Sequence, residues 1–247
     1  MERKWCIGAV SYLNTRPLLL GLEQSGLMPQ IELVKAYPAK IAQDLMDGTI
    51  DMGLVPVAVI PLLKEAYMTS NYCIGAEGDV ASVCIFSKVP MEQIKKVYLD
   101  YQSRTSVQLA HILLQQFWKK EVEFLKAEEG YIQHINGSTA GVIIGDRALA
   151  ARKQFPFIYD LAGAWKQHTG LPFVFATWIA NKPIPSKFME AFDKANGYGL
   201  MHLEEVIAGI PNAEQVYDLN TYFTQNISYD FNEEKRKGLD LFLSLIK

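Results

Sequence analysis

Polar side chains gather in a short loop near the start of the chain, where an apolar run gives way to a helical pattern. The segment Ser11-Tyr-Leu-Asn-Thr brings together four such side chains, Ser11, Tyr12, Asn14 and Thr15. Groups of this kind hydrogen-bond a polar ligand. They also cap helices, with Thr15 as the cap and Asn14 satisfying the backbone. The pattern leaves both interpretations open.

A second polar loop, Asp100-Tyr-Gln-Ser-Arg-Thr-Ser, precedes a helix predicted over 105–118. Its hydroxyl residues Ser103, Thr105 and Ser106 fall at the start of that helix. A helix N-terminus presents free N–H donors and a partial positive charge, which suit a carboxylate or a phosphate. Helix capping alone is the other interpretation. Arg104 points either at the ligand or into solvent.

Two further junctions between strand and helix are candidates for ligand contact. At Val55, Pro56 and Val57 the backbone amides could face a ligand, although a plain strand-to-helix turn explains the same residues. At Ile144-Gly-Asp-Arg, Gly145 permits a close approach of the backbone. Asp146 is predicted to cap a helix over 147–153, and a catalytic acid is the alternative role.

The elements that must position these loops alternate between strand and helix. Strand-length apolar runs lie at 5–10, 31–35, 51–55, 71–75, 81–87, 96–99, 122–125, 140–144, 157–161 and 172–180, and most are followed by helical patterns. Alternation of this kind predicts an α/β fold with mixed, mostly parallel sheets flanked by helices. We expect two lobes: lobe I from 1–81 and 177–247, and lobe II from 82–176. Crossings near 80–82 and 175–177 would then form a hinge above a ligand cleft.

Composition and charge exclude several classes of protein. The chain has 247 residues, is 49% hydrophobic, and carries 24 basic against 27 acidic side chains for a net charge of −3. This balance is typical of a folded domain and lacks the basic stripe of a nucleic-acid binder. No apolar run of about 18 residues predicts a membrane span, and the N-terminal segment lacks a signal-peptide core. We therefore expect a cytoplasmic protein that binds neither membrane nor nucleic acid.

Motifs for common cofactors are missing from the sequence. There is no GxGxxG, P-loop, GxSxG or HExxH segment, so dinucleotide, nucleotide, catalytic-triad and zinc sites have no support. Cys6, Cys73 and Cys84 show no metal-ligand spacing and are predicted to be buried thiols. The four histidines are scattered. No metal and no organic cofactor is predicted, and the sequence does not indicate an oligomeric state.

Six segments of the chain form a recognisable set: Ile7-Gly-Ala-Val-Ser-Tyr-Leu-Asn-Thr-Arg-Pro-Leu, Asp47-Gly-Thr-Ile-Asp-Met-Gly-Leu-Val-Pro-Val-Ala, Ala81-Ser-Val-Cys-Ile-Phe-Ser-Lys-Val-Pro, Ser103-Arg-Thr-Ser-Val, Ile144-Gly-Asp-Arg-Ala-Leu and Thr169-Gly-Leu-Pro-Phe-Val-Phe-Ala. Together they resemble one enzyme family, the chorismate dehydratases of menaquinone biosynthesis by the futalosine route. They run in order from residue 7 to about residue 180. No motif is recognised beyond residue 185.

The resemblance implies a two-lobe fold like that of type 2 periplasmic binding proteins, closing on a small anion. It implies a lyase that dehydrates the dianion chorismate to 3-[(1-carboxyvinyl)oxy]benzoate without a cofactor. On this basis we expect Ser82 and the helix start at 103–106 to hold the carboxylates and Asn14 to assist the elimination. No segment offers a convincing protein base, and the substrate's own enolpyruvyl carboxylate is the hypothesised proton acceptor.

Two alternatives share this fold. The sister enzyme that makes 1,4-dihydroxy-6-naphthoate carries a basic histidine in an Ile-His-Glu motif. This chain has Ile144-Gly145-Asp146 there, and glycine cannot take a proton. The second alternative is a non-catalytic solute-binding protein for a small anion. Such proteins are exported, and no export signal is recognised here.

Overall fold

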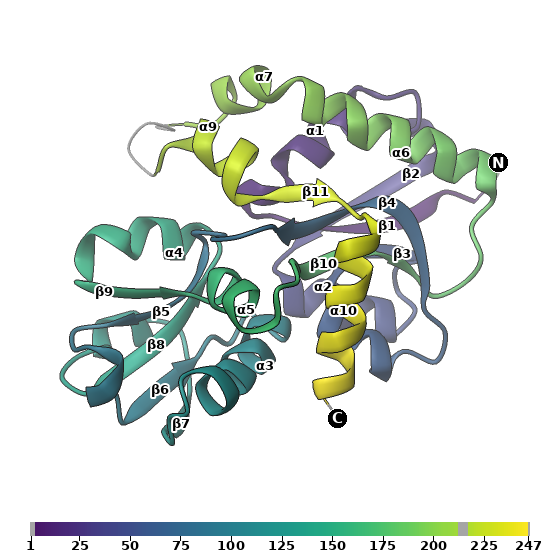
Figure 1. Cartoon of the computed structure of the whole chain (residues 1–247). Helices are drawn as coiled ribbons and strands as arrows, with labels where there is room; N and C mark the ends of the chain where they lie inside the picture. Colours follow the sequence, from purple (N-terminus) through teal and green to yellow (C-terminus); the bar gives the residue numbers. More distant parts are fainter. Residues whose placement is uncertain (1–2, 212–216, 247) are drawn as a thin grey trace.

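Short apolar segments of the chain form two separate β-sheets, which lie side by side and are flanked by helices (Figure 1). The structure is a computed structural model that describes residues 3–211 and 217–246. The first sheet has the order β11-β4-β10-β3-β1-β2 and consists of β1 (Trp5–Val10), β2 (Ile31–Ala36), β3 (Met52–Pro56), β4 (Tyr67–Ala76), β10 (Phe173–Ala180) and β11 (Ser228–Asp230). The second has the order β7-β6-β8-β5-β9 and consists of β5 (Val83–Ser87), β6 (Lys96–Leu99), β7 (Glu123–Lys126), β8 (Thr139–Ile144) and β9 (Phe157–Asp160).

Each sheet contains both parallel and antiparallel strand pairs. β1 runs parallel to β2 and β3, and β6 runs parallel to β7 and β8. β10 runs antiparallel to β3 and β4, and β5 runs antiparallel to β8 and β9. The α/β fold with mixed sheets is confirmed, but the expected predominance of parallel pairs is wrong. β10 enters the first sheet from the end where β1 and β3 finish, so it must run opposite to them.

Helices connect most strands and cover the sheets. They are α1 (Arg16–Gln24), α2 (Pro38–Met46), α3 (Thr105–Ile112), α4 (Asp146–Ala151), α5 (Leu161–Thr169), α6 (Ser186–Met201), α7 (Leu203–Ala208), α9 (Leu219–Thr221) and α10 (Glu233–Leu245). The helix predicted over 105–118 changes after Ile112 into a π-helical turn over Leu113–Phe117. None of the helices within residues 3–211 and 217–246 is long and apolar enough to cross a membrane.

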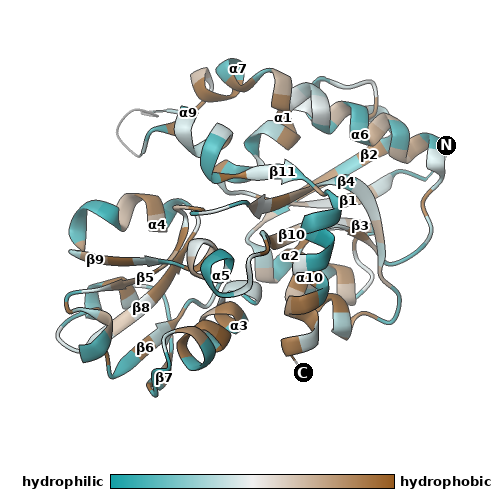
Figure 2. Cartoon of the chain, in the orientation of Figure 1, coloured by the Kyte–Doolittle hydropathy of each residue, from teal (hydrophilic) through white to brown (hydrophobic). Residues whose placement is uncertain are grey.

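The core follows the apolar strand runs. All eight residues of β10 and all five of β3 and of β5 are buried. Figure 2 shows hydrophobic residues along the strands of both sheets, whereas the helices mix hydrophobic and hydrophilic residues. The thiols of Cys73 and Cys84 are buried as predicted, but Cys6 is only half-buried.

The chain passes from the first sheet to the second between β4 and β5 and returns between α5 and β10. The expected first crossing, at 80–82, lies in the former segment. Phe175 and Thr177, expected at the second crossing, lie inside β10 of the first sheet. The lobe boundaries at 81/82 and 176/177 stay a prediction.

The C-terminal part of the chain returns to the first sheet. β11 pairs with β4, and the π-helical turn η8 (Tyr222–Asn226) precedes it directly. This pairing places Tyr229 against the loop at 11–15, where its hydroxyl donates to the Asn14 carbonyl over 2.9 Å. The segment without a recognised motif therefore supports the first polar loop.

Candidate active site

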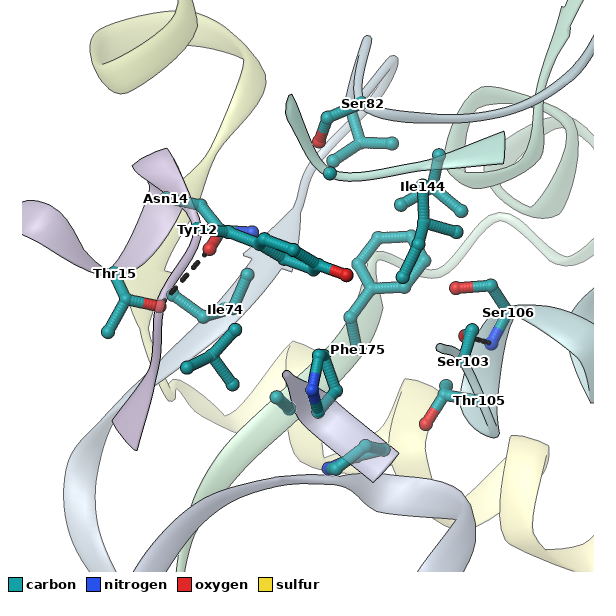
Figure 3. A pocket seen from close by; sticks show the side chains of 17 residues that line it. Tyr12, Asn14, Thr15, Ile74, Ser82, Ser103, Thr105, Ser106, Ile144 and Phe175 are labelled. Atoms are coloured by element: carbon teal, nitrogen blue, oxygen red, sulfur yellow. Dashed lines mark hydrogen bonds between the residues drawn. The ribbon is translucent and has the colours of Figure 1, made fainter. Parts of the chain in front are cut away.

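A cavity with about 520 Å³ of empty space, part of it open to solvent, is lined by residues from both sheets (Figure 3). The lining residues are Val10, Tyr12, Asn14, Thr15, Pro38, Pro56, Ile74, Val80, Ser82, Val83, Ser103, Thr105, Ser106, Ile144, Gly145, Phe175 and Ala176. They include the ends of β1, β3 and β8, as expected for an α/β fold. Every one of these side chains is neutral.

Most of the predicted site residues come together in this cavity. Those that line it are Tyr12, Asn14, Thr15, Pro56, Ser82, Ser103, Thr105, Ser106 and Gly145. Ser11 is exposed, and its N–H donates to the Ala36 carbonyl instead. Val55 and Val57 are fully buried in the core. Arg104 is half-buried and, like these three and Asp146, does not line the cavity.

The first polar loop forms the 3-10 turn Leu13–Thr15 and leads directly into α1. The Thr15 hydroxyl donates to Asn14 Oδ1 over 3.2 Å, and no side chain caps α1. The predicted capping role of Thr15 is therefore wrong, because its hydroxyl is directed at the neighbouring amide. This bond, drawn in Figure 3, leaves the amide hydrogens of Asn14 free to donate.

The second polar loop presents its hydroxyls at the N-terminus of α3. Ser103 Oγ accepts the N–H of Ser106 over 3.0 Å, and Thr105 Oγ1 accepts the N–H of Ala58 over 3.2 Å. Ser103 thus satisfies an N–H of the first turn of α3, although Arg104 occupies the N-cap position and no side chain caps the helix there. Because both oxygens act as acceptors here, the hydroxyl hydrogens of Ser103 and Thr105 remain available to a ligand in the cavity.

Asp146 joins the two sheets. Its Oδ1 accepts the backbone N–H of Leu13 over 3.0 Å, and its side chain caps no helix. The predicted capping role is wrong, because Asp146 is the first residue of α4 and its carboxylate meets the free N–H at the start of the turn over Leu13–Thr15. Burial raises the pKa of Asp146 above its ordinary value.

Gly145 carries a backbone conformation that requires glycine. Its φ of +62° lies in a region that side-chain-bearing residues rarely adopt. A Cβ atom at this position would lie 2.8 Å from Cδ2 of Tyr12. The predicted close approach at Gly145 is therefore made by the Tyr12 ring, which packs directly on this backbone.

Behind Tyr12 lies an ionic cluster that the sequence analysis did not identify. The Tyr12 hydroxyl donates to Gln102 Oε1, which also accepts from Arg147 Nη2 over 3.0 Å. Arg147 in turn pairs with the fully buried carboxylate of Asp100 at 2.8 Å. Burial raises the pKa of Tyr12, which keeps its hydroxyl protonated and a donor. The cluster ties Tyr12 to the second sheet.

Several cavity residues had no strong signal in the sequence. Pro38 begins a helix after a strand, so its position at a strand-to-helix junction was available as a signal. Ile74 and Phe175 belong to apolar runs and give no sign that they face a cavity. Within residues 3–211 and 217–246, no group of three or more His, Cys, Asp or Glu side chains is placed to hold a metal ion.

Comparison with known proteins identifies relatives over the whole length of the chain. A family model described as menaquinone biosynthesis matches residues 6–247. The chain is 26% identical to the chorismate dehydratase of Thermus thermophilus, over 97% of this chain and 94% of that protein. It is 25% identical to the chorismate dehydratase of Campylobacter jejuni subsp. jejuni, over 97% of this chain and 96% of that protein.

Solved structures support the same fold. The protein AF1704 from Archaeoglobus fulgidus superposes with a TM-score of 0.75 at 12% identity, over 98% of this chain and 96% of that chain. The periplasmic aliphatic sulphonate binding protein SsuA from Escherichia coli superposes with a TM-score of 0.63 at 16% identity, over 99% of this chain and 88% of that chain. The fold is that of the periplasmic binding proteins. Because the family model matches nearly the whole sequence, the chain belongs to the menaquinone biosynthesis family.

Proposed function

We propose that this protein is a lyase that removes water from chorismate to form 3-[(1-carboxyvinyl)oxy]benzoate. The observation that carries the proposal is the cavity itself. Neutral hydroxyl donors at a helix N-terminus on one sheet face Asn14 on the other. The names of the two relatives support the choice of chorismate, a substrate with two carboxylates.

The reaction sets clear demands on the site. The ring proton to be lost sits on the carbon that bears the enolpyruvyl ether, γ to the ring carboxylate through a double bond. When a base takes this proton, the electron pair of the C–H bond moves into the ring carboxylate. The neighbouring carbon then expels hydroxide, which combines with the proton as water and leaves an aromatic ring. The site must therefore stabilise growing negative charge on a carboxylate.

The donors for the carboxylates come from the second sheet and the segment that leads into it. Ser103, Thr105 and Ser106 lie at the N-terminus of α3, and Ser82 precedes β5. A preorganised donor of this kind contributes about 3–4 kcal/mol to the rate. The partial positive charge of the α3 N-terminus adds to these hydroxyls, so no charged side chain is required in the lining.

Asn14 is proposed to act on the departing hydroxyl or the carbon that reacts. It lies on the first sheet's side of the cavity, opposite the α3 hydroxyls in Figure 3. Its amide hydrogens are free to donate, because Thr15 occupies Oδ1. Donation to the leaving oxygen favours its departure as hydroxide.

The proton acceptor is proposed to be the substrate's own enolpyruvyl carboxylate. No aspartate, glutamate, histidine or lysine is among the lining residues. A tethered carboxylate acts at an effective molarity of about 10⁵ M or more, which compensates for its weak basicity. Asp146, the alternative acid, is directed at the Leu13 N–H.

The geometry at Gly145 argues against the sister reaction that yields 1,4-dihydroxy-6-naphthoate. That enzyme places a basic histidine at the corresponding position of its motif. Here any side chain at residue 145 would collide with the Tyr12 ring. The cytoplasmic location expected from the sequence stays a prediction.

The proposal is tested by incubating the purified protein with chorismate and identifying the product by mass and absorbance. We expect loss of one water and the appearance of an aromatic absorbance. Chorismate that is bound but unchanged would contradict the proposal and indicate a solute-binding protein. Chorismate that is neither bound nor changed would also contradict it, and would favour the sister enzyme or another anion.

A further inference from the structure

Tyr222, which does not line the cavity, makes direct contact with one of its hydroxyls. It begins η8 and is fully buried, and its hydroxyl donates to Ser82 Oγ over 2.8 Å. We propose that Tyr222 is a positioning residue that directs the hydroxyl hydrogen of Ser82 into the cavity, toward a substrate carboxylate. This inference rests on the proposed function and adds a residue from the C-terminal segment to it.

Both backbone polar groups of Ser82 form hydrogen bonds within the protein. Its N–H donates to the Val80 carbonyl over 2.7 Å, and its carbonyl accepts the N–H of Gly145 over 2.8 Å. The hydroxyl is therefore the only polar group that Ser82 can offer to a ligand. Its single hydrogen can serve as a donor only if something else fixes where it points.

The backbone around Ser82 is held in a strained turn. Ala81 has a φ of +61°, and the bond from Ser82 N–H to Val80 closes a three-residue γ-turn. The Asp160 carboxylate holds this turn by accepting the N–H groups of Val80 at 3.1 Å and Ala81 at 2.7 Å. Strain that is held by neighbouring groups is typical of functional sites. The Oγ of Ser82 is thus fixed in place before a ligand arrives.

The direction of the hydrogen bonds follows from the partners of Tyr222. Burial raises the pKa of Tyr222, so its hydroxyl keeps its proton. Tyr222 gives its one hydrogen to Ser82 Oγ. Among the residues that the structure describes, the Ser82 hydrogen then has no protein acceptor, and the cavity is the space that remains.

The arrangement links the proposed donor Ser82 to the C-terminal segment through one buried hydroxyl. Donors that are oriented before the reaction stabilise developing charge without a reorganisation cost. If the Tyr222 hydroxyl is absent, the Ser82 hydrogen is free to turn toward other acceptors. Because the ring carboxylate gains charge in the transition state, the loss should be in kcat more than in KM.

The test uses Tyr222→Phe in the full-length protein, with Tyr217→Phe as the matched control. The Tyr217 ring packs at 6.2 Å from the Tyr222 ring, and its hydroxyl bonds Asn226 and not Ser82. We expect Tyr222→Phe to lower kcat for chorismate by about tenfold to a hundredfold, which is less than the loss of a whole donor. We expect Tyr217→Phe to keep the wild-type kcat, and both variants to stay folded by thermal melting.

A double-variant cycle separates positioning from a structural role. In the Ser82→Ala background, the further change Tyr222→Phe should cost no additional activity, because Tyr222 acts through Ser82. If the two substitutions lowered kcat independently, so that their fold-losses multiplied in the double variant, the inference about Tyr222 would be overturned. A Tyr222→Phe variant with wild-type kcat would also overturn it. Neither result would contradict the proposed function. A wild-type protein that leaves chorismate intact would instead contradict the proposed function, and the inference would fall with it.

Discussion

The carboxylate of Asp146 on α4 accepts the backbone N–H of Leu13, the residue directly before Asn14, over 3.0 Å. This bond joins the second sheet to the loop that carries the proposed elimination residue. On the other side of the same loop, Tyr12 donates to Gln102. The position of Asn14 relative to the α3 hydroxyls therefore depends on two contacts between the sheets, in which Asp146 and Gln102 lie outside the cavity and Tyr12 lines it.

We predict that Asp146→Asn keeps turnover near the wild-type level. The amide oxygen of asparagine still accepts the Leu13 N–H, so the loop that carries Asn14 stays in place. If Asp146 were a catalytic acid, the same change would abolish turnover without weakening substrate binding. Steady-state kinetics and chorismate binding by calorimetry distinguish these results.

The same variant should change the pH dependence of stability. Because burial raises the pKa of Asp146 above 3.8, the folded state binds this proton more tightly than the unfolded state does. This contribution to wild-type stability is full below pH 3.8 and is lost as the pH rises through the raised pKa. Asparagine does not ionise, so Asp146→Asn should match or exceed the wild-type unfolding free energy at about pH 7 and lose that advantage at about pH 3. Urea unfolding across this range would contradict the account if the difference did not vary with pH.

We predict that Tyr12→Phe weakens chorismate binding by about two- to tenfold, the value of one hydrogen bond. The ring stays packed on Gly145, but the bond to Gln102 that joins the sheets is lost. Gln102→Ala should have a similar effect, and the double variant should lose no more than either one. Tyr198→Phe, on the exposed side of α6, is the control and should leave binding unchanged. If the two substitutions instead weakened chorismate binding independently, so that their fold-losses multiplied in the double variant, the Tyr12–Gln102 hydrogen bond would not be the cause of the losses.

Gly145→Ala and Gly137→Ala form a matched pair. Both glycines have a positive φ, +62° and +55°, so each alanine should cost about 1–3 kcal/mol of stability. Nothing lies within 4 Å of a Cβ at Gly137, whereas the Cβ at Gly145 meets the Tyr12 ring at 2.8 Å. Only Gly145→Ala should therefore also lower chorismate affinity. Equal affinities for the two variants would contradict the proposed role of the Tyr12 contact.

The polar loops were predictable because each one directly follows an apolar strand-length run. Ser103, Thr105 and Ser106 fall at a helix start that the hydrophobic pattern marks, and the structure places all three at the cavity. Gly145 was also predictable as a point of close approach, because glycine after a buried strand permits it.

Other parts of the site depend on contacts that no local pattern contains. Tyr229 reaches the first loop, and Tyr222 reaches Ser82, because β11 pairs with β4, which is far away in the sequence. The partner of Asp146 is a backbone N–H, which a sequence does not distinguish from any other. The antiparallel direction of β10 likewise follows from where the chain re-enters the first sheet and not from its composition.

Of the single substitutions predicted in this Discussion, removal of the Asn14 amide should lower kcat the most. We predict that Asn14→Ala and Asn14→Asp each lower kcat by about 10²–10³, the loss typical of one preorganised donor. Asn136→Ala, at an exposed loop away from the cavity, is the control and should retain full activity. An Asn14 variant with wild-type turnover would remove this residue from the mechanism.

The central claim is that this cavity eliminates water from chorismate with loss of the ring proton beside the ether. The most direct measurement is the mass of the product formed from chorismate that carries deuterium on the ring carbon bearing the enolpyruvyl ether. We predict an aromatic product without deuterium, because the label leaves with the proton acceptor and ends in water. Recovery of intact chorismate, or of a product that retains the deuterium, would contradict the account.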